Sequence, residues 1–557
     1  MPVIDLPLKR VNELLGKQLS LEELEEYCLQ LGADIDDKRE DGVKVEYNPN
    51  RPDFSSVPGF VRALKGIMNI ETGLPNYPLK KGSLKVKVEK TVEPLRPFIQ
   101  CAVVRNVHLT KESIAELMNT QETIHWVVGR DRKKVSIGIH DMRDITPPFR
   151  YYGEKADSHA FIPLGEESRK MTPKEICEEH PKGIKYAHLV NKDGSVPFLV
   201  DSKGGVLSFP PIINGILTLV TEKTKDLFID VTGTDEQAVK NALEILTSSF
   251  AEEGYQVEQV TVEYPDKKTL ITPTFQPSTW YLRPKYLKEV LGLDLTQEEL
   301  FKNLERSRFG VIKKESTRKK IAVSVPSYRV DILHEVDIVE DVAISYGYHN
   351  IEAILDNIHT IGEEHPVIKR QNQCRDIMVG LGFIEVVTYT LVSKEWQYTK
   401  MRTKGTPVEL LNPVSKEYNI VRDSLLPSLI NTLKQNKPYT LPQRIFDIGD
   451  VVRINDAYET KTSREVFLSG ATIHSKADFV EVKAIIEAIF RGLGINNYTL
   501  ESASHPSFFE GRCAKILVDK EPVGVFGEIH PEVLNNFELE NPVAAFEIEL
   551  EKLFPKL

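Results

Sequence analysis

Residues 326–351 read PSYRVDILHEVDIVEDVAISYGYHNI, and this stretch decides how the chain is interpreted. It predicts one short helix, and four carboxylates surround the start of that helix: Asp331, Asp337, Glu340 and Asp341. Apolar residues recur at helical spacing and predict its buried face: Val336, Val339, Ala343 and Tyr346. The stretch therefore combines a helix that packs on a core with a concentration of negative charge.

Three of the acids, Asp337, Glu340 and Asp341, stand three and four residues apart, which predicts that they share one surface patch. Asp331 precedes them and can fold back over the first turn. With only Arg329 and His334 nearby, four acids repel one another unless a positive charge lies among them. An all-oxygen cluster suits a hard cation such as Mg²⁺. A solvated acidic helix face is the alternative, and spacing alone leaves both open.

The composition is that of a soluble protein with several domains. Hydrophobic residues make up 41% and charged residues 27% of the 557 residues. A prior of about 150 residues per domain predicts three or four domains. No apolar run approaches the ~18 residues that a membrane span requires. The first ten residues have no signal-peptide pattern and indicate a strand leading into a helix, so we expect no membrane association.

Charge and cysteine content narrow the function further. The net charge of -11 argues against nucleic-acid binding through general basicity. The basic clusters at 130–134 and 318–320 are more typical of solvated loops or strand ends, so a partner would have to supply much of the positive field for nucleic acid. The five cysteines form no CxxC pair. We therefore predict neither a zinc site nor a disulfide framework, and expect a reducing cytoplasm.

The pattern along the chain predicts a multidomain α+β protein. Residues 1–78 form an N-terminal helical module, in which Ser20 and Glu23 make a capping box and Gly32 ends a helix. Residues 54–68 predict another helix, and the connector LPNYPLKKGS closes the module. Residues 84–263 alternate strands with helical segments, one of them at 235–252, and predict an α+β domain.

The second half of the chain predicts two more domains. Residues 268–358 contain helix, strand and helix with a basic hairpin, an arrangement similar to a winged helix. Residues 361–557 alternate helices with strands, including strands at 384–391 and 444–453. Short turns such as 519–522 predict that these strands are antiparallel.

Several stretches together resemble one family. The string Tyr328-Arg329-x-Asp331-Ile332, followed by the other three acids and Tyr346-Gly347-Tyr348, closely resembles the fifth B module of phenylalanyl-tRNA synthetase β subunits. Residues 210–235, PPIINGILTLVTEKTKDLFIDVTGTD, resemble the editing module of the archaeal and eukaryotic cytosolic form. Residues 48–66 resemble the N-terminal module of that form. The segments 422–433, 444–451 and 505–512 resemble its C-terminal domain, a class II synthetase fold.

The resemblance implies a partner and a cofactor. It implies an (αβ)₂ heterotetramer that uses ATP, bound at the α-chain site, to charge tRNA(Phe) with phenylalanine. In the family the acidic cluster binds Mg²⁺ together with the α subunit, and the matching positions here are Asp331, Asp337, Glu340 and Asp341. An ion shared between two chains neutralises carboxylates that otherwise repel one another, so it would strengthen the interface.

The C-terminal domain departs from an active class II site. Adenylation needs arginines that clamp the phosphates of ATP. The motif-two-like strand reads RIFDIGDVV, with no Phe-Arg-x-Glu, and the closing segment reads VAAFEIELEKL where Gly-x-Glu-Arg would stand. Structural roles explain Arg422 and Arg512 better than substitution for those arginines, and the same holds for His505 and His530, each of which precedes a proline. We therefore expect adenylation to belong to the α subunit.

The editing module has a physical reason to exist. A hydrophobic pocket for phenylalanine rejects tyrosine, which adds only a hydroxyl, about 10²-fold, so a second hydrolytic site is needed. Polar residues that could hold the phenol and a water lie in the segment that resembles this module: Asn214, Thr221, Asp230, Thr232 and Thr234. The alternative is that Asp230, Thr232 and Thr234 form a turn and cap the helix that begins near Asp235.

Two functions of other classes compete with this interpretation. One is an autonomous ATP-dependent ligase with unconventional active-site residues, and the missing class II arginines argue against it. The other is a non-enzymatic nucleic-acid-binding scaffold built on the winged-helix-like unit. The polar editing segment and the neighbouring module matches argue against that scaffold.

Overall fold

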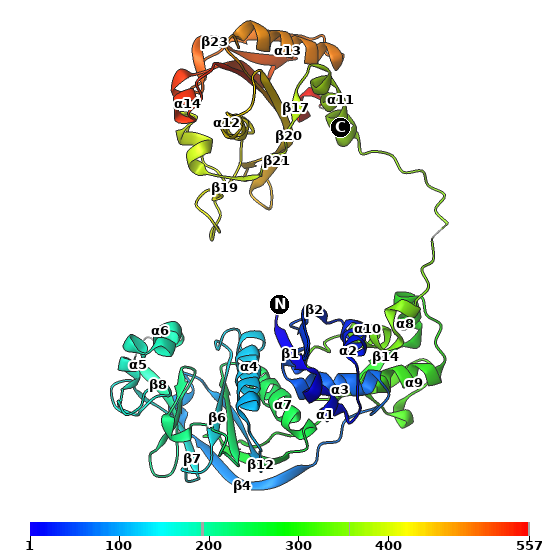
Figure 1. Cartoon of the computed structure of the whole chain (residues 1–557), viewed down its shortest axis with the longest axis vertical. Helices are drawn as coiled ribbons and strands as arrows, with labels where there is room; N and C mark the ends of the chain where they lie inside the picture. The colour runs from blue at the N-terminus through cyan, green and yellow to red at the C-terminus, as the bar shows by residue number, and fades with distance from the viewer. Residues whose placement is uncertain (191–193, 356, 555–557) are drawn as a thin grey trace. The chain divides into compact units, whose positions relative to one another are not determined.

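The structure is a computed structural model that describes residues 1–190, 194–355 and 357–554, so the last three residues of the predicted 361–557 domain lie outside it. The chain divides into two units, Met1–Leu355 and Asp356–Leu557 (Figure 1). Both units combine helices with sheets, in agreement with the predicted α+β class. Within the described residues, no helix has the length and hydrophobicity that a membrane crossing requires.

The first unit begins with a three-stranded antiparallel sheet and three helices (Figure 1). In the order β1-β3-β2, the strands are β1 (Val3–Pro7), β3 (Gly42–Glu46) and β2 (Asp34–Arg39). The helices are α1 (Leu8–Leu15), α2 (Leu21–Gln30) and α3 (Val57–Ile67), the last preceded by the 3-10 turn η1 (Pro52–Ser55).

The predicted capping box of Ser20 and Glu23 is confirmed at the start of α2. The description of this part as helical is incomplete, because the segment around β2 and β3 forms strands. Val43 and Val45 alternate into the core, while the charged residues between and around them face outward and conceal the strand in the sequence.

A ten-stranded sheet follows, in the order β10-β9-β8-β7-β4-β12-β5-β11-β6, with β13 beside β12. Its strands are β4 (Leu79–Val88), β5 (Phe98–Arg105), β6 (Val135–Asp141), β7 (Phe149–Lys155), β8 (Ser195–Val200), β9 (Val206–Phe209), β10 (Ile213–Asn214), β11 (Leu227–Gly233), β12 (Gln256–Glu263) and β13 (Thr269–Thr272). The helix α7 (Glu236–Glu252) packs on β5, β11 and β12, and α4 (Lys111–Val127) packs on β6. The short helices α5 (Pro173–Glu179) and α6 (Pro181–Tyr186) contact each other beyond β8 (Figure 1).

Two predicted segment boundaries change in this sheet. The second half of the connector LPNYPLKKGS is not a linker, because β4 starts at Leu79 and pairs in parallel with β12, where Leu79 lies opposite Val257. The stretch Thr269–Thr272, predicted to begin the third domain, pairs with β12 as β13. Both pairings involve β12: β4 pairs with it across about 180 residues, which local composition does not reveal, whereas β13 follows β12 along the chain and forms a hairpin with it.

The third part of the first unit has a small antiparallel sheet, ordered β14-β16-β15, and three helices. Its elements are β14 (Ser278–Leu282), α8 (Pro284–Leu291), α9 (Gln297–Arg306), β15 (Gly310–Val311), β16 (Ile321–Val325) and α10 (Glu335–Tyr346). A capping box of Thr296 and Glu299 starts α9. The helix α10 packs on α8, α9 and β14, so the acidic stretch lies on the core of this part.

The buried face of α10 differs in part from the predicted one. Its buried apolar residues are Ile338, Val339, Val342 and Ala343. Val336 is 38% exposed, so its assignment to the buried stripe is wrong. The buried stripe follows two neighbouring rows of side chains, one of residues 338 and 342 and the other of residues 339 and 343. Residue 336, in the first turn, lies at the edge of this stripe.

The second unit is a seven-stranded sheet, ordered β17-β20-β21-β25-β24-β23-β22, with helices on both faces. Its strands are β17 (Ile384–Glu385), β20 (Gln443–Ile454), β21 (Thr462–Ile473), β22 (Tyr498–Ser502), β23 (Phe508–Val518), β24 (Glu521–Ile529) and β25 (Val543–Glu549). The helices α11 (Pro366–Gly380) and α13 (Phe479–Gly492) share one core, and α12 (Leu426–Gln435) and α14 (Pro531–Asn536) share another; α15 (Leu550–Leu553) ends the unit.

The predicted antiparallel arrangement of this sheet is confirmed for every pair except β17–β20, which is parallel. The predicted strand at 384–391 is shorter than expected. Only Ile384–Glu385 joins the sheet, and the rest leads to β18 (Leu391–Val392), which pairs separately with β19 (Ile420–Val421). Val387 and Tyr389, whose types suggested a strand, are 92% and 76% exposed.

Candidate functional site

The ten-stranded sheet contains a cavity of about 230 Å³ next to α4. Most of its wall is apolar and includes Ile114, Leu117, Ile137, Ile139, Phe209 and Leu219. Polar side chains interrupt the wall at a few points: Gln121, Ser208, Asn214, Thr218 and Asp230. An apolar cavity with a few converging polar groups is the usual form of a small-molecule site.

A buried chain of three polar groups reaches this cavity at both ends. Asp230 Oδ2 lies 2.6 Å from His140 Nε2, and His140 Nδ1 lies 2.8 Å from Thr218 Oγ1. The three side chains are almost fully buried, at 1%, 0% and 1% exposure for Asp230, His140 and Thr218. Asp230 and Thr218 line the cavity, whereas His140 lies behind them. The ring of Phe228 stacks on the imidazole, with 5.9 Å between centroids.

The strand β6 makes room for this arrangement at one position. Gly138 lies opposite Asp230 in the β6–β11 pairing. A Cβ atom at residue 138 would lie 2.2 Å from Asp230 Oδ2 and 2.6 Å from His140 Nε2. Both distances are far inside van der Waals contact, so only glycine allows the Asp230–His140 contact at this register.

The structure separates the predicted editing residues into two groups. Asn214 and Asp230 line the cavity, but Thr232 and Thr234 do not. Thr232 is fully buried, and its hydroxyl accepts a hydrogen bond from Arg96 Nε at 3.0 Å and lies 2.9 Å from the Ser136 hydroxyl.

Thr234 is exposed at the end of β11, where its hydroxyl donates to the carbonyl of Lys133. Thr221 belongs to a turn, in which its hydroxyl accepts from the Lys223 N–H. The alternative, in which residues 230–234 form a turn and cap the helix that follows, is wrong in part. Asp230 lies within β11, and Asp235 caps α7 by accepting from the Ala238 N–H.

Charged side chains lie at one part of the cavity wall. Arg132 donates to Glu122 at 2.6 Å and to the carbonyls of Pro211 and Ile212, so this member of the 130–134 cluster is buried and structural, not solvated. Lys182 lies 3.2 Å from the same Glu122 carboxylate. A hydrogen bond with His125, together with these cations, holds the pKa of Glu122 well below its usual range.

Sequence reasoning missed His140, Thr218 and Gly138. A signal existed in the strand KVSIGIHD, where Ser136, Gly138 and His140 occupy alternate positions between isoleucines. Alternation of small or polar residues with large apolar ones places the first set on one face of a strand. On this face of the sheet, Asp230 of β11 lies opposite Gly138 of β6.

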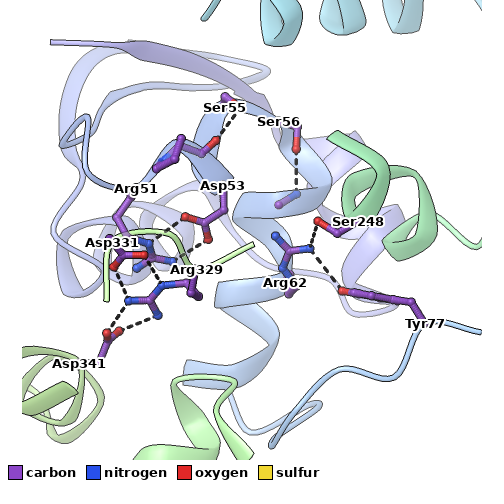
Figure 2. A network of polar contacts seen from close by, with 12 residues as sticks. Arg51, Asp53, Ser55, Ser56, Arg62, Tyr77, Ser248, Arg329, Asp331 and Asp341 are labelled. Carbon is purple, nitrogen blue, oxygen red and sulfur yellow. Dashed lines mark hydrogen bonds and ion pairs between the residues drawn. The ribbon is translucent and has the colours of Figure 1, made fainter. Parts of the chain in front are cut away.

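The acidic stretch forms a second site, and Figure 2 shows that Arg329 lies among its carboxylates. Arg329 donates to Asp331 through Nε at 2.9 Å and Nη2 at 2.7 Å, and to Asp341 through both Nη1 and Nη2. Burial by itself would raise the pKa of Asp331, but Arg329 outweighs burial and lowers it. Two of the four acids are therefore already paired within the chain.

The expectation of one shared surface patch is wrong for Asp341, which is 5% exposed and faces Arg329 inside the protein. The other two acids differ from it. Asp337 completes a capping box, and its Oδ2 accepts from the N–H groups of Leu333 and His334 at 2.7 and 2.6 Å.

Glu340 is exposed and, among the described residues, makes no hydrogen bond or ion pair. Its partial burial, and then the charges of Asp341, Asp331 and Asp337, raise its pKa. Excess negative charge thus remains around Glu340. Within the described part of the chain, no three His, Cys, Asp or Glu side chains converge enough to hold a metal ion.

The same network joins the acidic stretch to the N-terminal part (Figure 2). Arg51 makes a bidentate pair with Asp53, both bonds being 2.9 Å. Arg62, on α3, is fully buried, lies 3.4 Å from the centroid of the Tyr328 ring, and donates to Tyr77 and Ser248. Three parts of the first unit therefore meet around buried arginines.

In the second unit the residues considered as substitutes for adenylation arginines are engaged elsewhere. Arg422 is 3% exposed and donates to the carbonyl of Asp450 at 2.8 Å, to the Thr388 hydroxyl at 2.6 Å and to Asp447. Arg512 pairs with Glu528 at 2.6 Å. His505 and His530 accept from backbone N–H groups two residues later, in agreement with the predicted structural roles.

Comparison with known proteins gives consistent results. The family described as "tRNA synthetase B5 domain" matches residues 281–348, and that described as "Phenylalanyl tRNA synthetase beta chain CLM domain" matches residues 351–550. The chain is 42% identical over 555 residues to the phenylalanine–tRNA ligase β subunit of Methanosarcina barkeri, with 99% of each chain covered. It is 43% identical over 556 residues to that of Methanocaldococcus jannaschii, covering 99% of this chain and 100% of the relative.

A solved structure is also similar. It is an N-terminal fragment of the phenylalanyl-tRNA synthetase β subunit from Pyrococcus horikoshii, with a TM-score of 0.59 and 36% sequence identity. The match covers 62% of this chain and 99% of the fragment.

Proposed function

The chain belongs to the family of phenylalanine–tRNA ligase β subunits, and from this we propose that it charges tRNA(Phe) together with an α subunit and hydrolyses tyrosine from mischarged tRNA(Phe) in the cavity beside Asp230. It is thus a subunit of an aminoacyl-tRNA synthetase. The proposed assembly is an (αβ)₂ heterotetramer in the cytoplasm, whose α subunit binds ATP and phenylalanine. The 361–557 domain acts as a class II-like scaffold without adenylation residues.

The cavity is the single observation that carries the editing proposal. Its volume of about 230 Å³ suits an aromatic amino acid, and polar side chains interrupt a mostly apolar wall. A hydrolytic site must reject phenylalanine esters, and buried polar groups that pair with a substrate hydroxyl discriminate strongly against a substrate that lacks it. Asn214, Ser208 and Gln121 are wall residues outside the Asp230–His140–Thr218 chain that could pair with a phenol, because each carries donors and acceptors.

The acidic site fits the proposed shared Mg²⁺ in its chemistry. Its donors are carboxylate oxygens, which this ion prefers, and uncompensated charge remains around Glu340. Glu340 and Asp337 would provide oxygens, while Asp331 and Asp341 add charge from behind and stay paired with Arg329. The ion would neutralise these acids where the α subunit supplies further ligands.

The test uses the complex with the α subunit. Wild-type complex should hydrolyse Tyr-tRNA(Phe), and Asp230→Asn should reduce that rate while charging with phenylalanine is retained. The matched control is Asp235→Asn, because Asp235 is an aspartate five residues further along the chain that caps α7 and does not line the cavity. Equal deacylation by wild type and Asp230→Asn would contradict the assignment of the cavity.

The two competing functions make different predictions. An autonomous ligase would charge tRNA without any partner, and the engagement of Arg422 with Asp447 and Thr388 argues against it. A non-enzymatic scaffold would bind nucleic acid without hydrolysing any ester. Assays of the single chain for charging, and of the complex for deacylation, separate these functions from the proposed one.

A further inference from the structure

We propose that Thr218, His140 and Asp230 form a proton relay, in which the Thr218 hydroxyl receives a proton from the water that attacks the tRNA ester. This inference rests on the proposed editing function and assigns roles to two residues, Thr218 and His140, that the sequence did not single out. Thr218 touches the reacting water and is the catalytic group, whereas His140 acts through Thr218 and is a positioning residue.

Hydrogen-bond chemistry fixes the direction of the relay. In the relay Asp230 acts as a carboxylate, which only accepts, so His140 Nε2, at 2.6 Å from Asp230 Oδ2, carries the proton in that contact. In the neutral imidazole the other nitrogen, Nδ1, is then an acceptor. The hydroxyl of Thr218 lies 2.8 Å from Nδ1 and therefore donates to it.

Burial confines the imidazole to these two partners. His140 is 0% exposed, and Phe228 covers one face of its ring. The cavity wall includes Thr218 and Asp230 but not His140. The imidazole can thus exchange a proton with a ligand in the cavity only through one of these neighbours. Because Asp230 already accepts from Nε2, the hydroxyl of Thr218 is the route that remains.

The Thr218 hydroxyl also has a second acceptor, which it can use after His140 has taken up a proton. Thr218 Oγ1 lies 3.2 Å from the carbonyl of Gly215. When His140 is protonated at both nitrogens it donates to Thr218, and the hydroxyl proton can turn to Gly215. Both protonation states of the relay therefore keep the two imidazole nitrogens and the Thr218 hydroxyl paired, as buried networks require.

The proposed step balances without any reactant besides water. The water oxygen bonds to the ester carbonyl carbon, and the bond from that carbon to the ribose oxygen breaks. One water proton passes to Thr218 Oγ1 as the Thr218 proton passes to His140 Nδ1, and the imidazolium is stabilised by Asp230. The reverse transfer protonates the ribose oxygen. The products are the free amino acid and tRNA with a free ribose hydroxyl.

Four variants of the chain, each assembled with the α subunit, test the relay against a purely structural role. Thr218→Val removes the hydroxyl but keeps the shape, and Thr218→Ser restores it. His140→Gln places an amide near the Nε2 position, so it can still hold Asp230 but cannot take a proton from Thr218. The matched control is Thr247→Val, because the Thr247 hydroxyl is also buried in this unit but donates to the α7 carbonyl of Leu243.

Positioned acid–base groups contribute about 10²–10⁴-fold to rate. We expect Thr218→Val and His140→Gln to lower kcat for Tyr-tRNA(Phe) hydrolysis at least 100-fold, with KM within about threefold of wild type. Thr218→Ser and Thr247→Val should stay within about tenfold. Charging with phenylalanine serves as the folding control, because it takes place on the α subunit.

Other results would overturn the relay. Full activity of Thr218→Val, or activity of His140→Gln alongside an inactive Thr218→Val, would reduce His140 to a support for Asp230, while the editing function would stand. Loss of kcat in Thr218→Ser as severe as in Thr218→Val would show that shape, not the hydroxyl, matters. A wild-type complex without deacylation would instead refute the editing function itself.

Discussion

Replacing Arg329 with methionine removes the only guanidinium that the structure places between Asp331 and Asp341, among the residues it describes. The side chains of these two acids are 6% and 7% exposed, and each accepts two hydrogen bonds from Arg329. Methionine keeps much of the length of arginine but no charge, so two buried carboxylates lose their counter-ion. Breaking a buried ion pair from one side costs about 3–5 kcal/mol. We expect the free energy of unfolding of the first unit to fall by about that amount at pH 7.

The sign of the pH dependence follows from the pKa shift. Arg329 holds the pKa of Asp331 below its usual value against burial, so in wild type this stabilisation is present above the unfolded pKa and is lost as pH falls through the folded pKa. In Arg329→Met the bonded counter-ion is gone, and burial, which the charge of Arg51 offsets only in part, raises the pKa of both acids. The two acids then take up protons at a higher pH in the folded state. Protonation removes the unpaired buried charge that destabilises the variant. The deficit relative to wild type should therefore shrink between pH 7 and pH 5.

Urea unfolding at several pH values measures this deficit, because Trp280 packs against the core beneath α10 and reports on it by fluorescence. The triple variant Arg329→Met, Asp331→Asn, Asp341→Asn is the matched control. It removes all three charges together, so it should recover more than half of the lost stability. A deficit below about 1 kcal/mol at pH 7, or one that does not change with pH, would refute the reasoning that Arg329 neutralises buried carboxylates.

Three further predictions follow from the other contacts. Gly138→Ala should lower deacylation at least tenfold without affecting charging, since its Cβ would lie 2.2 Å from Asp230 Oδ2; a variant structure with the Asp230–His140 contact intact would contradict this. Glu340→Gln should raise the Mg²⁺ concentration needed for association with the α subunit, measured by analytical ultracentrifugation, whereas Glu335→Gln, which loses an ion pair with Arg283, should not. Ser20→Ala should destabilise the N-terminal part by about 1 kcal/mol in thermal unfolding, because it removes the cap of α2, and an unchanged transition would show that the cap is not needed.

The sequence predicted those elements whose signals are local. The capping box at Ser20, the helix at 235–252 and the turn at 519–522 depend on residues within a few positions of one another, and the structure has all three. At the last of these, Asp519 and Lys520 adopt positive φ, which a tight turn between twisted antiparallel strands requires. Local chemistry therefore suffices where the partner of each backbone group is near in sequence.

The sequence did not predict which distant segments of the chain pair with one another. The first residues of β4, from Leu79, looked like a linker because the partner strand, β12, lies about 180 residues away and the lysines there face outward. The relay residues His140, Thr218 and Asp230 come from three separate segments, and only the order of strands in the sheet brings them together. Likewise, the four acids between residues 331 and 341 are close in sequence. Which of them are paired depends on the direction in which the Arg329 side chain points.

In the second unit, which we propose is a class II-like scaffold without adenylation residues, the polar groups near the start of α12 are already paired. Glu547, on β25, is half-buried and accepts from the Ser424 hydroxyl and from the N–H groups of Leu425 and Leu426 at the start of α12. A carboxylate at that helix end satisfies N–H groups that α12 leaves unpaired. Burial raises the pKa of Glu547 even so, which makes the site a poor host for another anion.

Arg422, which follows β19, has its donors engaged as well. A phosphate clamp needs guanidinium N–H groups that point into open space. Those of Arg422 donate instead to Thr388, Asp447 and the carbonyl of Asp450. Its Nη2 also occupies the space beside Gly449, where a Cβ atom would lie only 2.3 Å away. The polar groups in this part of the second unit therefore bind one another, so adding arginines alone would not create an ATP site here.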